Sequence, residues 1–257
     1  MILKMNPDTT RIISLDGGGT RGYLQICMLK HFSQQVYDQH KISEQVFFNS
    51  FDVIAGTSIG GIIALGLAFG IKLCDIENIF IEKAKRIFTT RNYVDVVTNS
   101  LNASNDNRRP NILQKLFMIA NNLPFYKSKH YESNYGSNIL HQTLFDIFGN
   151  STLQDLKTSV LIPAYQQNTN TGVIFSNYNS DLYIGQNAKI VDVARATSAA
   201  PFYLPTYSFD KNTYIDGGVF CNDPTVLAYG LAKTLKKTSQ KTCILSLGTG
   251  ISADINS

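Results

Sequence analysis

The chain has 257 residues, of which 44% are hydrophobic and 16% are charged, and its formal net charge is +4. A chain of this length and composition can bury a hydrophobic core, so extensive disorder is excluded. The charged fraction lies below the ~25% typical of globular domains, and the lysines and arginines form no long runs. We therefore expect no nucleic acid among its partners.

The chain has four cysteines, at positions 27, 74, 221 and 243, and none of them forms a CxxC pair. This spacing predicts reduced thiols and no metal site. The N-terminus lacks the apolar core of a secretory signal, and no run reaches the ~18 apolar residues of a membrane-spanning helix. We expect a cytoplasmic or peripheral membrane protein, and the sequence leaves signal-independent secretion open.

Two strand–turn–helix units open the chain. Residues 11–15 predict a strand, and a glycine turn at 16–22 leads into a helix. That helix carries an apolar stripe with a spacing of four residues, formed by Leu24, Met28, Phe32 and Val36. A second strand over 51–55 leads through a turn at 56–60 into a helix over 61–69.

A third helix is expected to begin near a capping Asp75. One of its faces carries Ile76, Ile79, Phe80, Ile87 and Phe88. Residues 89–136 are rich in asparagine and predict little regular structure apart from a helix over 112–120. Long irregular segments in compact domains are usually lids, binding loops or disordered. We expect one domain over residues 1–257, with a lid or insertion at about 89–136.

Regular elements return after residue 137. The predicted helices cover 137–148, with Gly149 after the last turn, 190–200, stopped by Pro201, and 224–235. The predicted strands cover 160–164, 173–175, 214–218 and 242–247. Alternating strands and helices predict an α/β fold, specifically a three-layer α/β/α sandwich with a central, mostly parallel sheet.

Ser58 lies in Gly56-Thr-Ser-Ile-Gly60, a G-x-S-x-G pattern between a predicted strand and a predicted helix. A serine on such a sharp turn has a strained backbone and exposes its hydroxyl group as a nucleophile. An ordinary glycine turn is the alternative, because the pattern also occurs by chance. The strand–helix context favours the nucleophile.

A histidine base for Ser58 is disfavoured. The four histidines are His31, His40, His130 and His141, and none follows the best candidate acid along the chain. That acid is Asp216, which ends an apolar strand immediately before Gly217 and Gly218. A carboxylate there can hydrogen-bond a serine hydroxyl directly and act as its base. The alternative is an Asp-Gly hairpin turn.

Three consecutive glycines, Gly17, Gly18 and Gly19, follow the first strand. Their N–H groups can converge on an anion, such as the oxyanion of a tetrahedral intermediate. Arg21 adds a cation that could hold a phosphate. The same stretch also satisfies G-x-G-x-x-G, which raises a nucleotide-binding oxidoreductase as an alternative. Such a site requires an acid at the end of a second strand, and Asp38 instead lies in a polar stretch.

The set of motifs resembles the patatin-like phospholipases, in order, over residues 11–250. Besides the glycine loop and the serine turn, the matching segments are Ala196-Thr-Ser-Ala-Ala-Pro-Phe-Tyr203, Asp216-Gly-Gly218, Asn222-Asp-Pro224 and Leu245-Ser-Leu-Gly-Thr-Gly250. The resemblance implies a metal-independent lipid acyl hydrolase without a cofactor. Ser58 would be the nucleophile and Asp216 its base, Gly17, Gly18 and Gly19 the oxyanion hole, and Arg21 the phosphate ligand.

The substrate implied by this resemblance is a phospholipid or another lipid ester, with peripheral membrane contact. A protein activator is left open. A non-catalytic module that binds lipid and only retains the fold is a further alternative. Residues 89–136 match the family less clearly than the rest of the chain.

Overall fold

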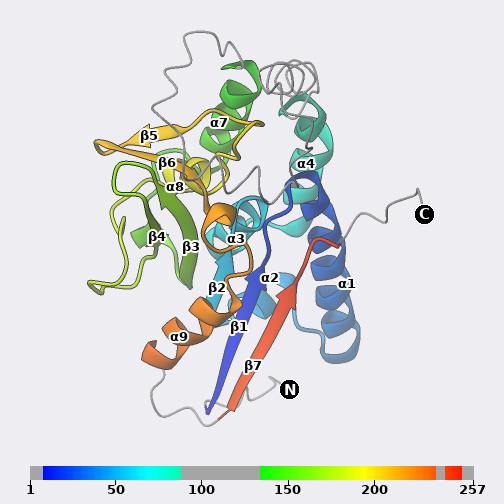
Figure 1. Cartoon of the computed structure of the whole chain (residues 1–257). Helices are drawn as coiled ribbons and strands as arrows, with labels where there is room; N and C mark the ends of the chain where they lie inside the picture. The colour runs from blue at the N-terminus through cyan, green and yellow to red at the C-terminus, as the bar shows by residue number, and fades with distance from the viewer. Residues whose placement is uncertain (1–7, 88–133, 236–240, 251–257) are drawn as a thin grey trace, which may run out of the picture.

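The structure is a computed structural model, and it describes residues 8–87, 134–235 and 241–250 (Figure 1). The predicted lid and its helix over 112–120 lie outside the described residues, apart from the last few positions before 137. Phe88, placed on the third predicted helix, also lies outside them.

A seven-stranded sheet forms the centre of the molecule, in the order β5-β6-β3-β2-β1-β7, with β4 paired to β3 beside this path. The strands are β1 Thr9–Leu15, β2 Val53–Gly56, β3 Ser159–Gln166, β4 Thr171–Phe175, β5 Tyr207–Phe209, β6 Asn212–Asp216 and β7 Lys241–Leu247. Strands β3, β2, β1 and β7 are parallel neighbours, whereas β4 and β6 pair with β3 in antiparallel fashion. The predicted α/β fold with a mostly parallel central sheet is confirmed.

Helices cover both faces of this sheet, as a largely parallel sheet requires. The α-helices are α1 Gly22–His40, α2 Glu44–Phe48, α3 Ile59–Phe69, α4 Leu73–Ile87, α7 Asn134–Phe148, α8 Ile190–Thr197 and α9 Thr225–Leu235. Ile12 of β1 packs with α9 on one face. Its neighbour Ile13 packs with the larger core formed by α1, α3, α7 and α8 on the other face (Figure 1).

The buried face of α1 differs from the predicted stripe. Leu24 and Met28 are exposed, and the buried positions are Gly22, Gln25, Ile26, Leu29 and Ser33. The Gln25 amide group is buried because it donates to the carbonyl oxygens of Asp16 (3.0 Å) and Leu247 (2.7 Å), at the ends of β1 and β7. A polar residue therefore sits in the core at a position outside the predicted apolar stripe.

Several boundaries also differ from the predictions. Helix α4 begins at Leu73 rather than at Asp75, and α8 ends at Thr197 rather than at residue 200. The short helix α2 and the short strand β5 were not predicted. Gly149 does follow α7 with a φ of 55°, as expected, and its N–H donates to the Phe145 carbonyl.

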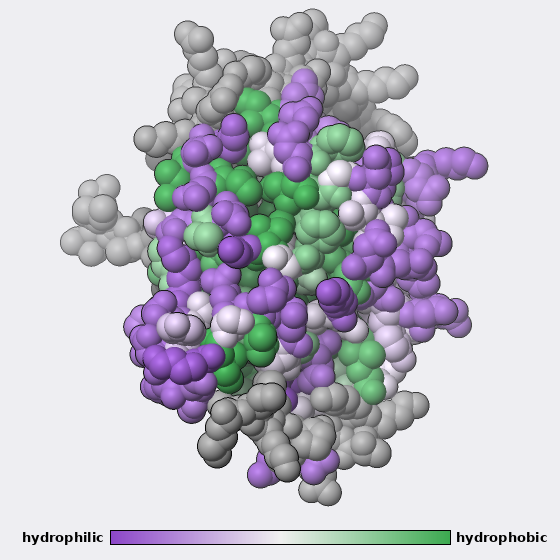
Figure 2. Space-filling view, turned by 180° about the vertical axis from the view of Figure 1, so that it is seen from behind, coloured by the Kyte–Doolittle hydropathy of each residue, from purple (hydrophilic) through white to green (hydrophobic). Residues whose placement is uncertain are grey.

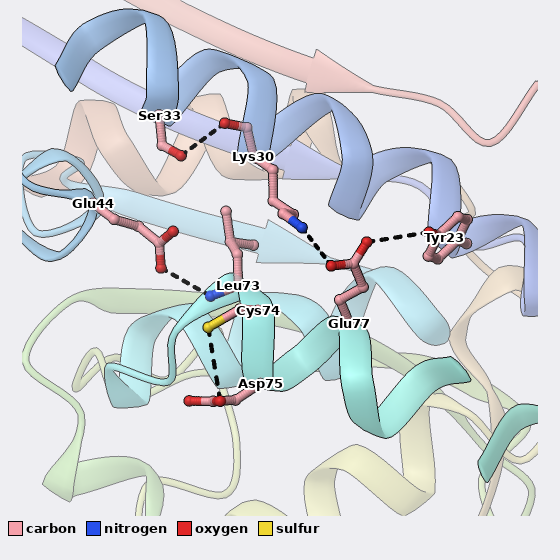
Figure 3. Close-up of polar contacts among 8 residues, drawn as sticks. All are labelled: Tyr23, Lys30, Ser33, Glu44, Leu73, Cys74, Asp75 and Glu77. Atoms are coloured by element: carbon pink, nitrogen blue, oxygen red, sulfur yellow. Dashed lines mark hydrogen bonds and ion pairs between the residues drawn. The ribbon is translucent and has the colours of Figure 1, made fainter. Parts of the chain in front are cut away.

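Polar side chains attach the first turns of α4 to α1 and α2 (Figure 3). Glu77 forms an ion pair with Lys30 and accepts a hydrogen bond from the Tyr23 hydroxyl at 3.1 Å. The Glu44 carboxylate accepts the Leu73 N–H at 2.8 Å, which satisfies one of the free donors at the start of α4. These contacts hold α4 against the body of the protein. Within residues 8–87, 134–235 and 241–250, no helix has the length and apolar character needed to cross a membrane.

The observed orientation of α1 makes a prediction about stability. We expect Leu29→Ala to lower the free energy of unfolding by about 2–5 kcal/mol, because it leaves a cavity in the core. Leu24→Ala, in the same helix, should cost less than about 1 kcal/mol because that side chain is exposed. Urea denaturation of both variants measures the difference. Equal losses would contradict the assigned face.

Candidate active site

Ser58 lies on the sharp turn between β2 and α3, with φ 56° and ψ −122°. A non-glycine residue in this region costs about 1–2 kcal/mol, so surrounding contacts must hold it there. A Cβ atom on Gly60 would lie 2.4 Å from the Leu15 carbonyl oxygen. Only glycine therefore lets α3 pack this closely on β1. The predicted strand–turn–helix around the serine is confirmed.

Thr197, at the end of α8, fixes the backbone of this turn. Its Oγ1 accepts the Ser58 N–H at 3.0 Å and donates to the Pro163 carbonyl at 2.6 Å. The sequence identifies residues 196–203 only as a segment that matches the family, and the specific contact of Thr197 was missed. A hydroxyl residue within a short apolar helix was the available signal.

Asp216, the last residue of β6, lies directly against the serine. Its Oδ2 accepts the Ser58 hydroxyl at 2.6 Å, and its Oδ1 accepts the Gly218 N–H at 2.7 Å. The two residues are 158 positions apart along the chain. Strand β3 brings them together, because β2 pairs with its first half and β6 with its second half.

Burial raises the pKa of Asp216 from its ordinary value of 3.8 to about 6. The hydrogen bonds from Ser58 and Gly218 lower the pKa, but loss of solvation is the larger effect. The carboxylate is therefore more basic than an exposed one and is still ionised at neutral pH. Such a group can accept a proton from a neighbouring hydroxyl.

The described histidines lie away from this pair. His31 and His40 are exposed on α1, and His141 stacks on Phe145 in α7. Ser58 donates its hydroxyl to Asp216 instead. His130 falls outside the described residues.

The glycine loop after β1 faces Ser58, but its three amides differ. The Gly17 N–H already donates to the Asn222 carbonyl at 3.1 Å. The Gly18 and Gly19 amides, which line the same cavity as Ser58, have no acceptor within the part of the chain that the structure describes. Gly18 and Gly19 thus fit the predicted oxyanion hole, whereas the Gly17 amide is engaged elsewhere. Sequence reasoning could not separate them, because the acceptor comes from residue 222.

Arg21 lies at the edge of this loop and is exposed. Its Nη1 donates to the Gly250 carbonyl at 3.0 Å. A guanidinium has five N–H donors, so this contact leaves others for a ligand. The side chain also lines the cavity that begins at Ser58. Its position is compatible with the predicted phosphate contact.

The geometry does not support the nucleotide-binding alternative. Asp38 lies near the end of α1, where it accepts a hydrogen bond from Gln34 at 2.8 Å. The second strand of the unit, β2, ends at Gly56 and leads to Ser58 rather than to an acid. A dinucleotide fold would place the acidic residue at the end of that strand.

An apolar cavity of about 600 Å³ begins at Ser58. It lies on the side of the sheet opposite α9, between α3, α4 and α7. The residues that line it include Gly18, Gly19, Arg21, Ser58, Ile59, Ile62, Ile63, Gly66, Ile71, Ile76, Ile79, Phe80, Lys83, Ile87, Leu140, Leu144, Ile147, Phe148 and Tyr203. The described part of the predicted apolar face of α4 therefore borders this cavity, and Ile76, Phe80 and Ile87 also pack against the larger core. Figure 2 shows hydrophobic residues gathered in the middle of the face opposite the one seen in Figure 1, surrounded by hydrophilic ones.

We find no group of three or more His, Cys, Asp or Glu side chains placed to bind a metal within the described ranges. The four cysteines are free thiols.

Asp16 is a second carboxylic acid with a raised pKa. Burial and the nearby Asp223 charge raise the pKa of Asp16 to about 6. The Asp16 Oδ2 atom lies 3.5 Å from the place that a Cβ atom on Gly248 would occupy.

Comparison with known proteins gives consistent matches. Residues 13–229 match the family described as patatin-like phospholipase. The cGAMP-activated phospholipase of Vibrio cholerae is 34% identical over 221 residues, which cover 84% of this chain and 56% of the relative. Patatin-like protein 4 of Arabidopsis thaliana is 30% identical over 268 residues, which cover 93% of this chain and 59% of the relative. The chain thus spans little more than half the length of these relatives.

Among solved structures, VipD from Legionella pneumophila aligns with 97% of this chain and 52% of its own chain. The identity is 16% and the TM-score is 0.49.

The raised pKa of Asp216 makes a prediction about pH and stability. Between about pH 4 and pH 6 the folded chain binds more protons than the unfolded chain, so this group lowers stability as the pH rises. Asp216→Asn removes the titration. The free energy of unfolding of Asp216→Asn minus that of the wild-type chain should therefore increase by roughly 2–3 kcal/mol from about pH 4 to about pH 8.

Denaturant unfolding at several pH values measures this gain. The control is Asp210→Asn, which neutralises an exposed carboxylate in the turn between β5 and β6. A pH-independent difference between Asp216→Asn and the wild-type chain would contradict the raised pKa.

Proposed function

Because the chain belongs to the patatin-like phospholipase family, we propose that it is a lipid acyl hydrolase that cleaves fatty acyl esters with Ser58 and Asp216. The observation that carries the proposal is the 2.6 Å hydrogen bond from the Ser58 hydroxyl to the Asp216 carboxylate, at the entrance of an apolar cavity. A phospholipase A or lysophospholipase type of reaction fits this arrangement.

The proposed reaction has two steps. The Ser58 Oγ attacks the ester carbonyl carbon while its proton passes to Asp216 Oδ2, and the tetrahedral intermediate expels the alcohol, which takes up that proton. The product of this step is an acyl-enzyme on Ser58. Water then attacks the acyl-enzyme, Asp216 accepts a proton from the water, and it passes this proton to the Ser58 Oγ as the fatty acid leaves.

The Gly18 and Gly19 amides are the proposed donors to the oxyanion of each tetrahedral intermediate. One such donor is worth about 3 kcal/mol in the transition state. The N-terminus of α3, directly after Ser58, adds a favourable partial positive charge. The reaction as proposed needs neither a metal ion nor a cofactor.

The proposed substrate is a phospholipid or a related lipid ester. Its acyl chain would enter the apolar cavity, and Arg21 would contact the headgroup phosphate. Contact with a membrane surface is part of this proposal, because the substrate resides there. Three of the relatives are named cGAMP-activated phospholipase, so we include cGAMP as the first candidate activator.

We expect Ser58→Ala and Asp216→Asn each to reduce ester hydrolysis by at least about 10⁴-fold, because each removes a group that acts in both steps. The measurement is kcat/KM with p-nitrophenyl esters and with phospholipid vesicles, with and without cGAMP. A fluorophosphonate probe should label the wild-type chain and fail to label Ser58→Ala.

Exposed residues of the same types provide the matched controls, Ser208→Ala and Asp210→Asn. Both should keep wild-type rates. Hydrolysis that survives in either active-site variant would defeat the proposed pair. A wild-type chain that binds lipid without labelling or hydrolysis would indicate a non-catalytic lipid-binding module instead.

The activity should also follow the ionisation of Asp216. Only the carboxylate form can accept the serine proton, and burial raises its pKa to about 6. We therefore expect kcat/KM to rise with pH and to reach half of its plateau near pH 6. A profile that stays flat down to about pH 4 would argue against Asp216 as the base.

A further inference from the structure

The cavity runs along α3 from a polar end to an apolar end. Ser58 stands at the start of this helix, and the α3 residues that border the cavity are Ile59, Ile62, Ile63 and Gly66. A helix rises 1.5 Å per residue, so Gly66 lies about 12 Å from Ser58 along the axis. Glycine amides and Arg21 line the Ser58 end.

The end near Gly66 is enclosed by apolar side chains. A Cβ atom on Gly66 would lie 3.1 Å from Ile76 Cδ1 and 3.9 Å from Ile71 Cδ1, and both isoleucines border the cavity. Phe148 also borders it and packs edge-on against Phe69, the last residue of α3, with ring centroids 5.4 Å apart. Any atom added at position 66 therefore enters the space between α3 and α4.

The backbone does not require glycine at this position. Gly66 lies inside a helix, where glycine costs about 1 kcal/mol relative to alanine. The atoms nearest to its missing Cβ are the ends of flexible isoleucine side chains. This differs from Gly56 and Gly60, whose Cβ atoms would collide with main-chain atoms. The evident consequence of glycine at position 66 is that Ile76 packs close to the α3 backbone at the far end of the cavity, so a side chain added there would push Ile76 into the cavity.

We propose that Gly66 is a specificity-determining residue that sets the length of acyl chain the cavity accepts. The inference rests on the proposed function, since it places the acyl chain in the cavity that begins at Ser58. A long chain passes Ile63 and ends in the space beside Gly66, between Ile71 and Ile76. A short acyl chain ends before this space and does not reach Gly66.

The test compares Gly66→Val with the wild-type chain on p-nitrophenyl butyrate, octanoate and palmitate. Burial of one methylene is worth about fourfold in binding, so loss of two or more should lower kcat/KM for palmitate by at least about tenfold. The butyrate value should stay within about twofold. The control is Gly230→Val, because Gly230 lies in α9 on the other side of the sheet and its Cβ would meet nothing within 4 Å.

An equal fall with all three esters, or an unchanged profile, would overturn the role of Gly66. If circular dichroism shows that Gly66→Val does not fold, Gly66→Ala replaces it, with an expected loss of about fourfold on palmitate alone.

If the wild-type chain hydrolyses no ester, the proposed function fails, and the inference is then tested by binding. Fluorescence of cis-parinaric acid, a long-chain fatty acid, is titrated with Ser58→Ala and with Ser58→Ala/Gly66→Val. At least about tenfold weaker binding by the double variant supports the inference, and equal affinity overturns it.

Discussion

The site depends on one buried carboxylate being held against one strained serine. Asp216 ends β6 and Ser58 lies on the turn after β2. These two strands flank β3 on its two sides, and second-neighbour strands are about 10 Å apart. The serine covers part of this distance because its turn lifts the side chain away from β2. Thr197 holds the turn in place by joining the Ser58 N–H to the Pro163 carbonyl of β3 itself. The same strand therefore positions both members of the pair.

Close backbone packing around the serine explains the glycine pattern of the sequence. Gly60 lets the first turn of α3 rest on main-chain atoms at the end of β1, and Gly56 lets the same turn approach the end of β2. The glycine loop after β1 then lies beside Ser58, with its Gly18 and Gly19 amides bordering the same cavity. Because the carboxyl ends of β1 and β2 are adjacent in a parallel sheet, two segments separated in sequence meet at one corner of the candidate site.

The sequence predicted the parts of the site that local chemistry determines. Ser58 and its turn were predicted from a short motif between a strand and a helix. Asp216 was predicted because it ends a strand and is followed by glycines. The buried face of α1 was not predictable, because Gln25 is buried only through carbonyls supplied by two distant strands. The apolar stripe on α4 was predicted as a helix face, but periodicity alone cannot tell a filled core from a cavity. The engaged amide of Gly17 depends likewise on residue 222.

Three local costs to stability coincide at this site. Ser58 has a strained backbone, burial raises the pKa of Asp216, and Gly66 replaces a better helix former inside α3. Each costs on the order of 1–3 kcal/mol, which is a sizeable share of the stability of a domain. A chain selected for stability alone would favour a neutral side chain at position 216. All three features border or adjoin a single apolar cavity, so their coincidence is better explained by a ligand than by folding.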